Sequence, residues 1–485
     1  MFSTRLRAAA MAALASAVAA AALAVPATAG ATTATTPRTV PAPALRTAPA
    51  GVLPLLGQVR ATRRAGARAV TATAAPITSP LSPTQCEARW GIECYDASLL
   101  RKIYGLGSRD EGKGAVVALI MPYHNPVLRH DLDVYAKQAG GPAPDLHVTE
   151  IGNPVTASPG NTTQAAAEME AELDAEMIYA MAPRARIDFF ETQTDFSLDP
   201  LDFSYYASIL KGLADQRPKV DAVSLSLGWA EGNYAEAAGS TTAGDAVIRQ
   251  QAAIINAAVR DGITFTVATG DTGSAGVDLA GTGVYTAPAV LFPASDPMVI
   301  SASGTEVRAN DAGDRTQPDT VWSNGGDNGA TGGGVSSVFA RPSYQASYSA
   351  LTGNHRGVGD ISMDAATESP VWAYFSRYNL FAPEEATGWE FIAGTSAAAP
   401  LLTGIVTDAS ALAGHPLGDI HPALYAMARH PAANGIQPVV TGCNTDYGIP
   451  GYCASTGPWS LPAGTGTVGD GARFVAALAA AASRR

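Results

Sequence analysis

The chain has 485 residues, of which 47% are hydrophobic and 15% are charged, so it can bury a large core. Its net charge is −12, and the first 80 residues contain eight arginines and no acidic residue, which leaves −20 on residues 81–485. A body this acidic argues against nucleic acid as a partner. It is more consistent with a protein that works at low pH.

The N-terminus has the pattern of a secretory signal peptide, residues 1–29. Arg5 and Arg7 precede an apolar run from Ala8 to Val25, and Ala27-Thr28-Ala29 supplies a small-residue cleavage site. The alternative is a membrane anchor, which we disfavour because the run is rich in alanine and only marginally long enough. We therefore expect a secreted, extracellular protein without a stable membrane anchor.

Residues 30–80 are rich in Ala, Thr, Pro and Arg and show little periodicity. This composition predicts a disordered linker or a short propeptide. Arg63-Arg64 is a candidate processing point.

From residue 81 the pattern becomes globular, and we assign residues 81–475 to one domain, followed by a C-terminal tail at 476–485. Buried strands alternate with helices, which predicts an α/β fold with a mostly parallel sheet and helices on both faces. The predicted strands are 115–120, 187–190, 222–227, 263–268 and 298–302, and the predicted helices are 165–181, 203–215, 243–260, 396–413 and 421–429.

The four cysteines form two close pairs, Cys86 with Cys94 and Cys443 with Cys453. In an exported protein this arrangement predicts two local disulfides. The spacing does not resemble that of zinc ligands, and no histidine lies close in sequence to either pair.

Ser396 is the first candidate for chemistry, because Gly394-Thr395-Ser396 opens a helix of small apolar residues. A helix N-terminus offers free N–H groups and the positive end of the helix dipole, which together can stabilise an oxyanion. A simple helix cap is the alternative.

Glu170 and Asp174 are the second candidate. They are spaced four apart and share an apolar helical face, so both carboxyls are expected to point inward, where they would share protons. An ion pair between Glu170 and a distant arginine is the alternative. Glu168, Glu172 and Glu176 form another ladder on the same helix, which we predict to be a solvated surface face.

Two further segments follow predicted strands. Gly270-Asp271-Thr272-Gly273 comes directly after a strand, where α/β folds build sites, although a tight turn is the alternative. Ser224–Gly228 is a strand that ends in glycine, and an extended peptide could add to it through main-chain hydrogen bonds.

The histidines argue against a Ser-His-Asp enzyme. None of the seven is followed by glycine or opens a helix in the His-Gly-Thr-His pattern, and the chain has neither a Gly-x-Ser-x-Gly elbow nor a His-Glu-x-x-His motif. A serine and an acid pair without a suitable histidine point to a serine peptidase whose general base is a carboxylate.

These segments, taken together and in this order, resemble the sedolisins, a family of serine-carboxyl peptidases with a subtilisin-like fold. The resemblance spans roughly residues 81–470. The matching segments are Glu170-x-x-Leu173-Asp174, Ser224-x-Ser226-x-Gly228, Gly270-Asp271-x-Gly273, Phe292–Ser295, Gly332–Ser336, Asp360-Ile361-Ser362 and Gly394-Thr395-Ser396 to Pro400.

The resemblance implies a role for each candidate. Ser396 would be the nucleophile, Glu170 the general base and Asp174 its partner, while Asp271 would donate a hydrogen bond in the oxyanion hole. Ser226-Leu227-Gly228 would pair with the substrate backbone. We therefore expect acid-active hydrolysis of protein or peptide substrates through an acyl-enzyme, by a monomer with a three-layer fold.

Two departures from the family pattern stand out. Residues 30–80 are too few for the long folded prodomain of the family. The regions that match the family's calcium site read Pro438–Gly442 and Thr456–Ser460 and lack both acidic ligands, although Asp446 or Asp470 could substitute. We expect no cofactor and no metal ligands, and regard calcium as doubtful.

Three functional readings stay open. We favour an endopeptidase; a tripeptidyl-peptidase of the same family is the first alternative. A catalytically silent, peptidase-like binding protein is the second, and the intact Glu170, Asp174, Asp271 and Ser396 argue against it.

Overall fold

The structure is a computed structural model. It describes residues 45–47 by their backbone and residues 77–107, 111–158, 161–193, 199–217, 219–325, 329–377 and 388–482. The predicted signal peptide and nearly all of the predicted linker lie outside the described residues.

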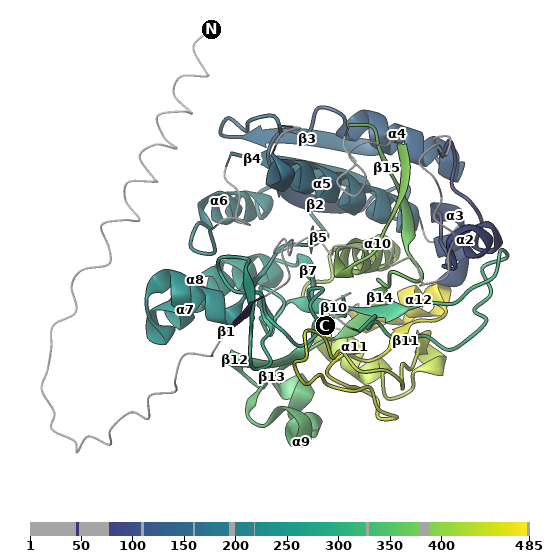
Figure 1. The fold of residues 1–485 in the computed structure, drawn as a ribbon. Helices are drawn as coiled ribbons and strands as arrows, with labels where there is room; N and C mark the ends of the chain where they lie inside the picture. Colours follow the sequence, from purple (N-terminus) through teal and green to yellow (C-terminus); the bar gives the residue numbers. More distant parts are fainter. Residues whose placement is uncertain are drawn as a thin grey trace, which may run out of the picture. The chain divides into compact units, whose positions relative to one another are not determined.

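A ten-stranded sheet forms the centre of the described domain, and eight of its strands run parallel (Figure 1). Short antiparallel strands, β17 and β11, pair with β18 and β10. In spatial order the strands are β17 (Ile436–Gln437), β18 (Thr467–Val468), β14 (Ile361–Asp364), β10 (Ile300–Glu306, with β11, Thr320–Val321, beside it), β7 (Thr264–Ala268), β5 (Ala222–Leu225), β2 (Val116–Pro122), β4 (Arg186–Thr192) and β3 (Asp145–Ile151).

The central strands are buried along their whole length, as β2, β5 and β7 show. Such strands are rich in Val, Ile, Leu and Ala because both faces of the sheet are covered by helices. The predicted parallel α/β architecture is therefore confirmed, and each of the five predicted strands and five predicted helices overlaps an observed element.

Helices pack on both faces of the sheet. In Figure 1, α6, α7 and α8 lie to the left of the strands, and α10 and α12 lie to the right. The helices are α2 (Pro83–Trp90), α3 (Ala97–Ile103), α4 (Leu128–Ala139), α5 (Thr162–Met181), α6 (Ser204–Leu213), α7 (Glu231–Ala238), α8 (Thr241–Arg260), α9 (Ser349–Thr352), α10 (Thr395–Ala413), α11 (His421–Met427) and α12 (Gly471–Ala482).

The position of α5 depends on an unusual connection. The chain runs from β2 through α4 to β3, and then back through α5 to β4, so two right-handed crossovers would place α4 and α5 on opposite faces. Instead α5 packs against both α4 and α10, whereas α6 packs against α8. The crossover through α5 therefore has the reverse hand, and this places α5 beside α10.

α10 is the central helix of its face and packs on α5, α12 and five strands of the sheet. It is the one helix among the described residues that is long and apolar enough to cross a membrane, but 83% of its apolar window is buried inside the protein. α10 is therefore a core helix.

Smaller strand pairs surround the main sheet: β6 (Trp229–Ala230) with β9 (Leu291–Phe292), β12 (Gly334–Ala340) with β13 (His355–Val358), β15 (Val371–Phe375) with β16 (Gly388–Ile392), and β1 (Leu45–Thr47) with β8 (Gly283–Tyr285). The last pair joins a part of the predicted linker to the domain by an antiparallel ladder of three residue pairs.

Both predicted disulfides are present, Cys86–Cys94 and Cys443–Cys453. At the other end of the domain, the predicted boundary at residue 475 falls inside α12, whose Leu478 is fully buried in the main core. The ordered C-terminal helix therefore extends to Ala482, seven residues into the predicted tail.

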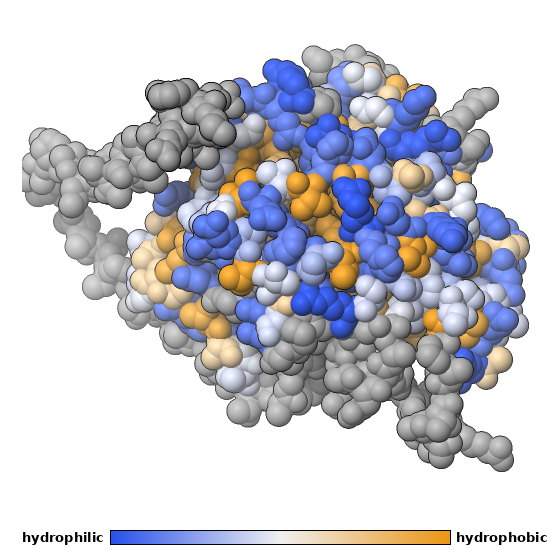
Figure 2. Space-filling model, turned by 90° about the horizontal axis from the view of Figure 1, so that it is seen from above, coloured by the Kyte–Doolittle hydropathy of each residue, from blue (hydrophilic) through white to orange (hydrophobic). Residues whose placement is uncertain are grey.

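The edge strand β3 is mostly polar. Only Leu146 of its seven residues is buried, and Asp145, His147 and Glu150 are exposed. Figure 2, which looks down on this side of the molecule, shows largely hydrophilic residues with hydrophobic ones between them. Charged side chains on an edge strand discourage pairing with other chains.

Candidate active site

Ser396 lies in the first turn of α10 and is 4% exposed. Gly394 precedes the helix with φ of 130°, and its N–H donates to the Ala365 carbonyl at 2.8 Å. A Cβ at Gly394 would lie 2.7 Å from Oδ2 of Asp271. A residue with a side chain would be strained at this φ, and its Cβ would clash with Asp271. Gly394 therefore allows the backbone path that leads into Ser396.

Asp271 follows β7 and holds the start of α10. Its Oδ1 accepts hydrogen bonds from the Thr395 N–H at 2.7 Å and from the Thr395 hydroxyl at 2.8 Å. The Gly270 N–H in turn donates to the Thr395 hydroxyl oxygen at 2.9 Å. The Asp271 carboxyl is thereby fixed one residue away from Ser396, with Oδ2 beside Gly394.

Glu170 and Asp174 lie on the face of α5 that packs against α10, and both are buried. α10 allows this close contact because it has glycine at position 404, where a Cβ would lie 2.5 Å from Cβ of Met181. The predicted inward orientation of the two acids is observed. Neither carboxyl oxygen of Glu170 accepts a hydrogen bond from any described residue, so the alternative of an ion pair between Glu170 and an arginine is not observed among them.

Ser226, just after β5, connects the acid pair to the start of α10. Its hydroxyl donates to Oδ1 of Asp174 at 2.7 Å and lies 3.3 Å from the carbonyl oxygen of Ser396. The structure thus brings together Ser226, Asp174 and Ser396 from β5, α5 and α10. The side chain of Ser226 is committed to this contact, which leaves the backbone of Leu227 and Gly228 for other partners.

Gly228 lies against a neighbouring strand pair. A Cβ at this position would approach the Phe292 carbonyl oxygen to 2.9 Å, and the next residue, Trp229, pairs with Phe292 in the β6–β9 ladder. The segment therefore leaves β5 and turns into a second strand pair beside the acids.

The acid pair holds its protons strongly. Burial raises the pKa of Glu170 well above its usual range, and the nearby Asp174 raises it further, while the Ser396 and Ser226 hydroxyls oppose the shift. Burial also raises the pKa of Asp174 to about 8, against the hydrogen bond from Ser226. The Ser396 hydroxyl is close enough to influence Glu170 but makes no hydrogen bond of normal geometry with it. Such contacts commonly tighten only when substrate binds.

The second acidic ladder corrects the prediction of a solvated face, because Glu168, Glu172 and Glu176 are all buried. α5 has no free face: α10 covers one side, and α4 and β15 cover another. Glu168 pairs with Arg377 at 3.3 Å, Glu172 accepts from the Asn125 amide at 2.9 Å, and Glu176 accepts from the Tyr374 N–H at 3.0 Å. The feature of the sequence that could have indicated this burial is the composition of α5, which has no basic residue and many alanines.

In the region that matches the family's calcium site, Gly442 lies against Val321. A Cβ at Gly442 would lie 2.9 Å from the Val321 side chain, and the Cys443–Cys453 disulfide follows directly. Asp470 accepts from the Arg473 N–H at 3.1 Å and forms an ion pair with its guanidinium at 3.0 Å. Among the described residues, no three metal-ligating side chains meet in this region; the one such group lies elsewhere, at His124, Glu150 and Glu191.

The chain is similar to known proteins in sequence and in fold, although no family model matches it. Kumamolisin from Bacillus sp. strain MN-32 is 32% identical over 298 residues, which cover 59% of this chain and 48% of kumamolisin. Sedolisin from Pseudomonas sp. strain 101 is 33% identical over 263 residues, which cover 53% of this chain and 40% of sedolisin. The chain is a relative of the sedolisins.

The solved structures agree with this relationship. A structure of Pseudomonas sedolisin, described as a serine-carboxyl proteinase complexed with two molecules of pseudo-iodotyrostatin, superposes with a TM-score of 0.64 at 26% identity. It matches over 79% of this chain and 98% of that one. The subtilisin-like α/β fold expected from the sedolisin resemblance is therefore confirmed. The chain spans about half the length of the curated sedolisin relatives it matches, or less.

Proposed function

We propose that this protein is a serine-carboxyl peptidase that hydrolyses peptide bonds through an acyl-enzyme on Ser396. The observation that carries the proposal is the buried acid pair of α5, which faces the N-terminus of α10 with Asp271 fixed beside it. The relationship to the sedolisins supports the same reaction.

In the proposed mechanism, the Ser396 hydroxyl oxygen attacks the substrate carbonyl carbon while Glu170 accepts the hydroxyl proton. Asp174, which accepts a hydrogen bond from the Ser226 hydroxyl, shares the protons of the pair with Glu170. Asp271, carrying a proton, donates a hydrogen bond to the developing oxyanion. The proton held by Glu170 then passes to the leaving amine as the peptide bond breaks. Water next attacks the acyl carbon while Glu170 accepts a water proton, and that proton returns to the Ser396 oxygen as the ester bond breaks, which releases the acid product.

Acid conditions suit this arrangement. The raised pKa values of Glu170 and Asp174 keep at least one proton on the pair well above the ordinary carboxyl range. Full ionisation would place two negative charges in a buried site with no cation among the described residues that contact them. Glu170 can accept a proton only in the singly protonated pair, in which Glu170 is ionised and Asp174 keeps its proton. We propose that hydrolysis depends on this form. We propose further that it is fastest in acid, where bound substrate brings the Ser396 hydroxyl onto Glu170 and favours its ionised state, and that it is lost where both acids ionise.

The setting of the proposed enzyme is extracellular. The pattern of residues 1–29 and the two disulfides support secretion, since disulfides persist in oxidising compartments. We further propose that the protein acts as a monomeric endopeptidase on unfolded protein.

The test is hydrolysis of an unfolded protein substrate from acid to alkaline pH by the wild type and by Ser396→Ala. Mass analysis of the products distinguishes internal fragments from successively released tripeptides. An activity peak in acid, lost in the variant, with an acyl-enzyme on Ser396 trapped by acid quenching, is the expected result. A folded, processed protein without activity at any pH would contradict the proposal.

A further inference from the structure

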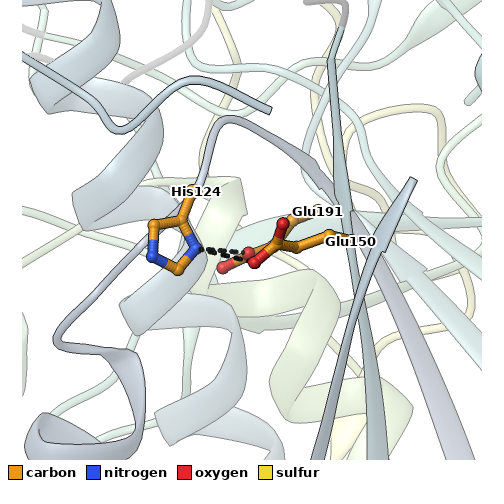
Figure 3. A group of neighbouring side chains, drawn as sticks. All are labelled: His124, Glu150 and Glu191. Atoms are coloured by element: carbon orange, nitrogen blue, oxygen red, sulfur yellow. Dashed lines mark hydrogen bonds and ion pairs between the residues drawn. The ribbon is translucent and has the colours of Figure 1, made fainter. Parts of the chain in front are cut away.

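Three metal-ligating side chains, none of them assigned to catalysis, meet at the carboxyl end of the central sheet. Glu150 and Glu191 are directly opposite one another in the β3–β4 ladder, and Glu191 is also opposite Met121 of β2. His124 follows β2 by two residues. Because the three strands are parallel neighbours, their carboxyl ends bring these side chains together, as Figure 3 shows.

The potential ligand atoms already lie close together. Nδ1 of His124 is 2.8 Å from Oε2 of Glu191 and 3.7 Å from Oε1 of Glu150, and all three atoms lie within 4.8 Å of one another. In Figure 3 the imidazole points at both carboxylates. Glu191 is fully buried, whereas the side chains of His124 and Glu150 are 33% and 58% exposed, so the group is open to solvent on one side.

Neighbouring residues hold the two inner side chains in place. The other oxygen of Glu191, Oε1, accepts the Asn125 N–H at 2.9 Å. The Asn125 side chain is itself anchored, since its oxygen accepts from the Val127 and Leu128 N–H groups at 3.0 and 2.9 Å. The His124 N–H donates to the Val155 carbonyl at 3.0 Å. Second-layer contacts of this kind orient metal ligands in proteins.

From this geometry we infer that His124, Glu150 and Glu191 form a binding site for a divalent metal ion of the zinc class. One imidazole nitrogen and two carboxylate oxygens form a ligand set that Zn²⁺ accepts, and the two carboxylate charges balance the charge of the ion. Solvent water would complete a tetrahedral site on the exposed side.

Binding of the metal ion requires one proton to be displaced and the ligand atoms to shift slightly. The ion takes the place of the proton between Nδ1 of His124 and Oε2 of Glu191, and the neutral imidazole then carries its proton on Nε2. Zinc ligands at about 2.0–2.2 Å from the ion are separated by about 3.3 Å in a tetrahedron, so the two atoms move apart by about half an ångström. The bound ion would tie the ends of β2, β3 and β4 together.

The test is calorimetric titration of the full-length protein with zinc chloride at neutral pH, after dialysis against a chelator. We expect one ion per chain and a rise in Tm of about 3 °C when free zinc is a hundredfold above Kd. Glu150→Gln and His124→Ala are each expected to weaken binding on the order of a hundredfold. Glu150 is exposed, so its substitution leaves folding intact by circular dichroism.

His147→Ala is the matched control. His147 is an exposed histidine of the same edge strand, paired with Asp145 at 2.8 Å, and its removal should leave zinc affinity unchanged. A chain that binds no zinc at a one-to-one ratio would overturn the inference, and the His124–Glu191 contact would then be a structural hydrogen bond only. Equal affinity in the wild type and Glu150→Gln, or a preference for calcium over zinc, would overturn it as well.

Discussion

One helix, α5, carries two sets of buried carboxylic acids on different faces. Glu170 and Asp174 face α10, while Glu168, Glu172 and Glu176 face α4 and the β15 hairpin. Burial is the largest cause of the raised pKa in every one of these five groups. Burial and a perturbed pKa therefore do not separate a catalytic acid from a structural one in this protein.

The surroundings do separate them. Each acid of the second set has a partner that holds it: Arg377, the Asn125 amide or the Tyr374 N–H. Glu170 has no hydrogen bond from the described residues. The groups that affect its pKa besides burial are the other acids, Asp174 first, and the hydroxyls of Ser396 and Ser226. A carboxyl group left without a partner beside a serine at a helix N-terminus is available for proton transfer, which is the difference that points to function.

The largest expected effect comes from Ser396→Ala and Glu170→Gln. Each removes a group that takes part in bond formation or proton transfer, so hydrolysis should fall on the order of 10⁴-fold or more. Glu172→Gln is the matched control, because it neutralises a buried acid of the same helix on the other face, and it should keep activity within about tenfold. The measurement is kcat/KM on a protein substrate in acid, and equal losses in Glu170→Gln and Glu172→Gln would erase the distinction between the two sets.

Asp271→Ala should give the next largest effect. Loss of one oxyanion donor lowers kcat by about 10²–10³-fold, and loss of the bonds to Thr395 lowers the free energy of unfolding by about 1 kcal/mol. Asp271→Asn keeps an acceptor for Thr395 and a donor that cannot ionise. It should retain part of the activity and shift the alkaline limb of the pH profile upward. Identical pH profiles and rates for the two variants would argue against Asp271 as a donor.

Gly404→Ala tests the close contact between α5 and α10, which brings Glu170 and Asp174 near α10. A Cβ at 2.5 Å from Cβ of Met181 and 3.1 Å from the Ile178 carbonyl oxygen must push the helices apart. We expect a loss of about 1–3 kcal/mol in the free energy of unfolding and a 10- to 100-fold loss of kcat/KM. Gly212→Ala is the control, because a Cβ there meets no atom within 4 Å. The measurements are the free energy of unfolding in urea and kcat/KM. Equal values for Gly404→Ala and Gly212→Ala would contradict the importance of the contact at Gly404.

The smallest effect concerns stability against pH. The buried acids keep their protons in the folded state at pH values where the unfolded chain ionises them. They therefore stabilise the fold below about pH 4, and this contribution is lost as the pH rises through the folded pKa values, about 7 for Glu168 and about 8 for Asp174. Unfolding free energy should fall from pH 4 to pH 8.

Glu172→Gln and Glu176→Gln should each flatten that slope by up to about 1.4 kcal/mol per pH unit, because glutamine has no proton to lose. The measurement is urea unfolding at pH 4, 6 and 8 for the wild type and both variants. A wild-type protein that becomes more stable with rising pH would contradict the assignment of raised pKa values.

The sequence predicted the parallel sheet and the inward acid pair because both depend on local pattern. Long apolar runs such as the one in β2 can be buried only between helices, and the i, i+4 spacing of Glu170 and Asp174 places them on one face of any helix. The edge strand β3 was not predicted, since only Leu146 of its residues is buried and the alternation of Leu146 and Val148 with polar residues is too short to stand out.

The burial of Glu168, Glu172 and Glu176 was predicted wrongly, because it depends on partners far away in the chain. Arg377 and Tyr374 lie more than 190 residues downstream. The alanine-rich composition of residues 162–181 is compatible with burial, but it does not identify the residues that cover this face. The ladder contacts between Glu150 and Glu191, and the closeness of His124 to both, escape sequence reasoning for the same reason.

The reverse-handed crossover through α5 has a consequence for the timing of activity. Glu170 and Ser396 come from segments more than 220 residues apart, and they meet only because α5 crosses to the face where α10 later docks. A chain still being synthesised therefore holds the acid pair without Ser396, and in the proposed enzyme hydrolysis would begin only after α10 has docked beside α5.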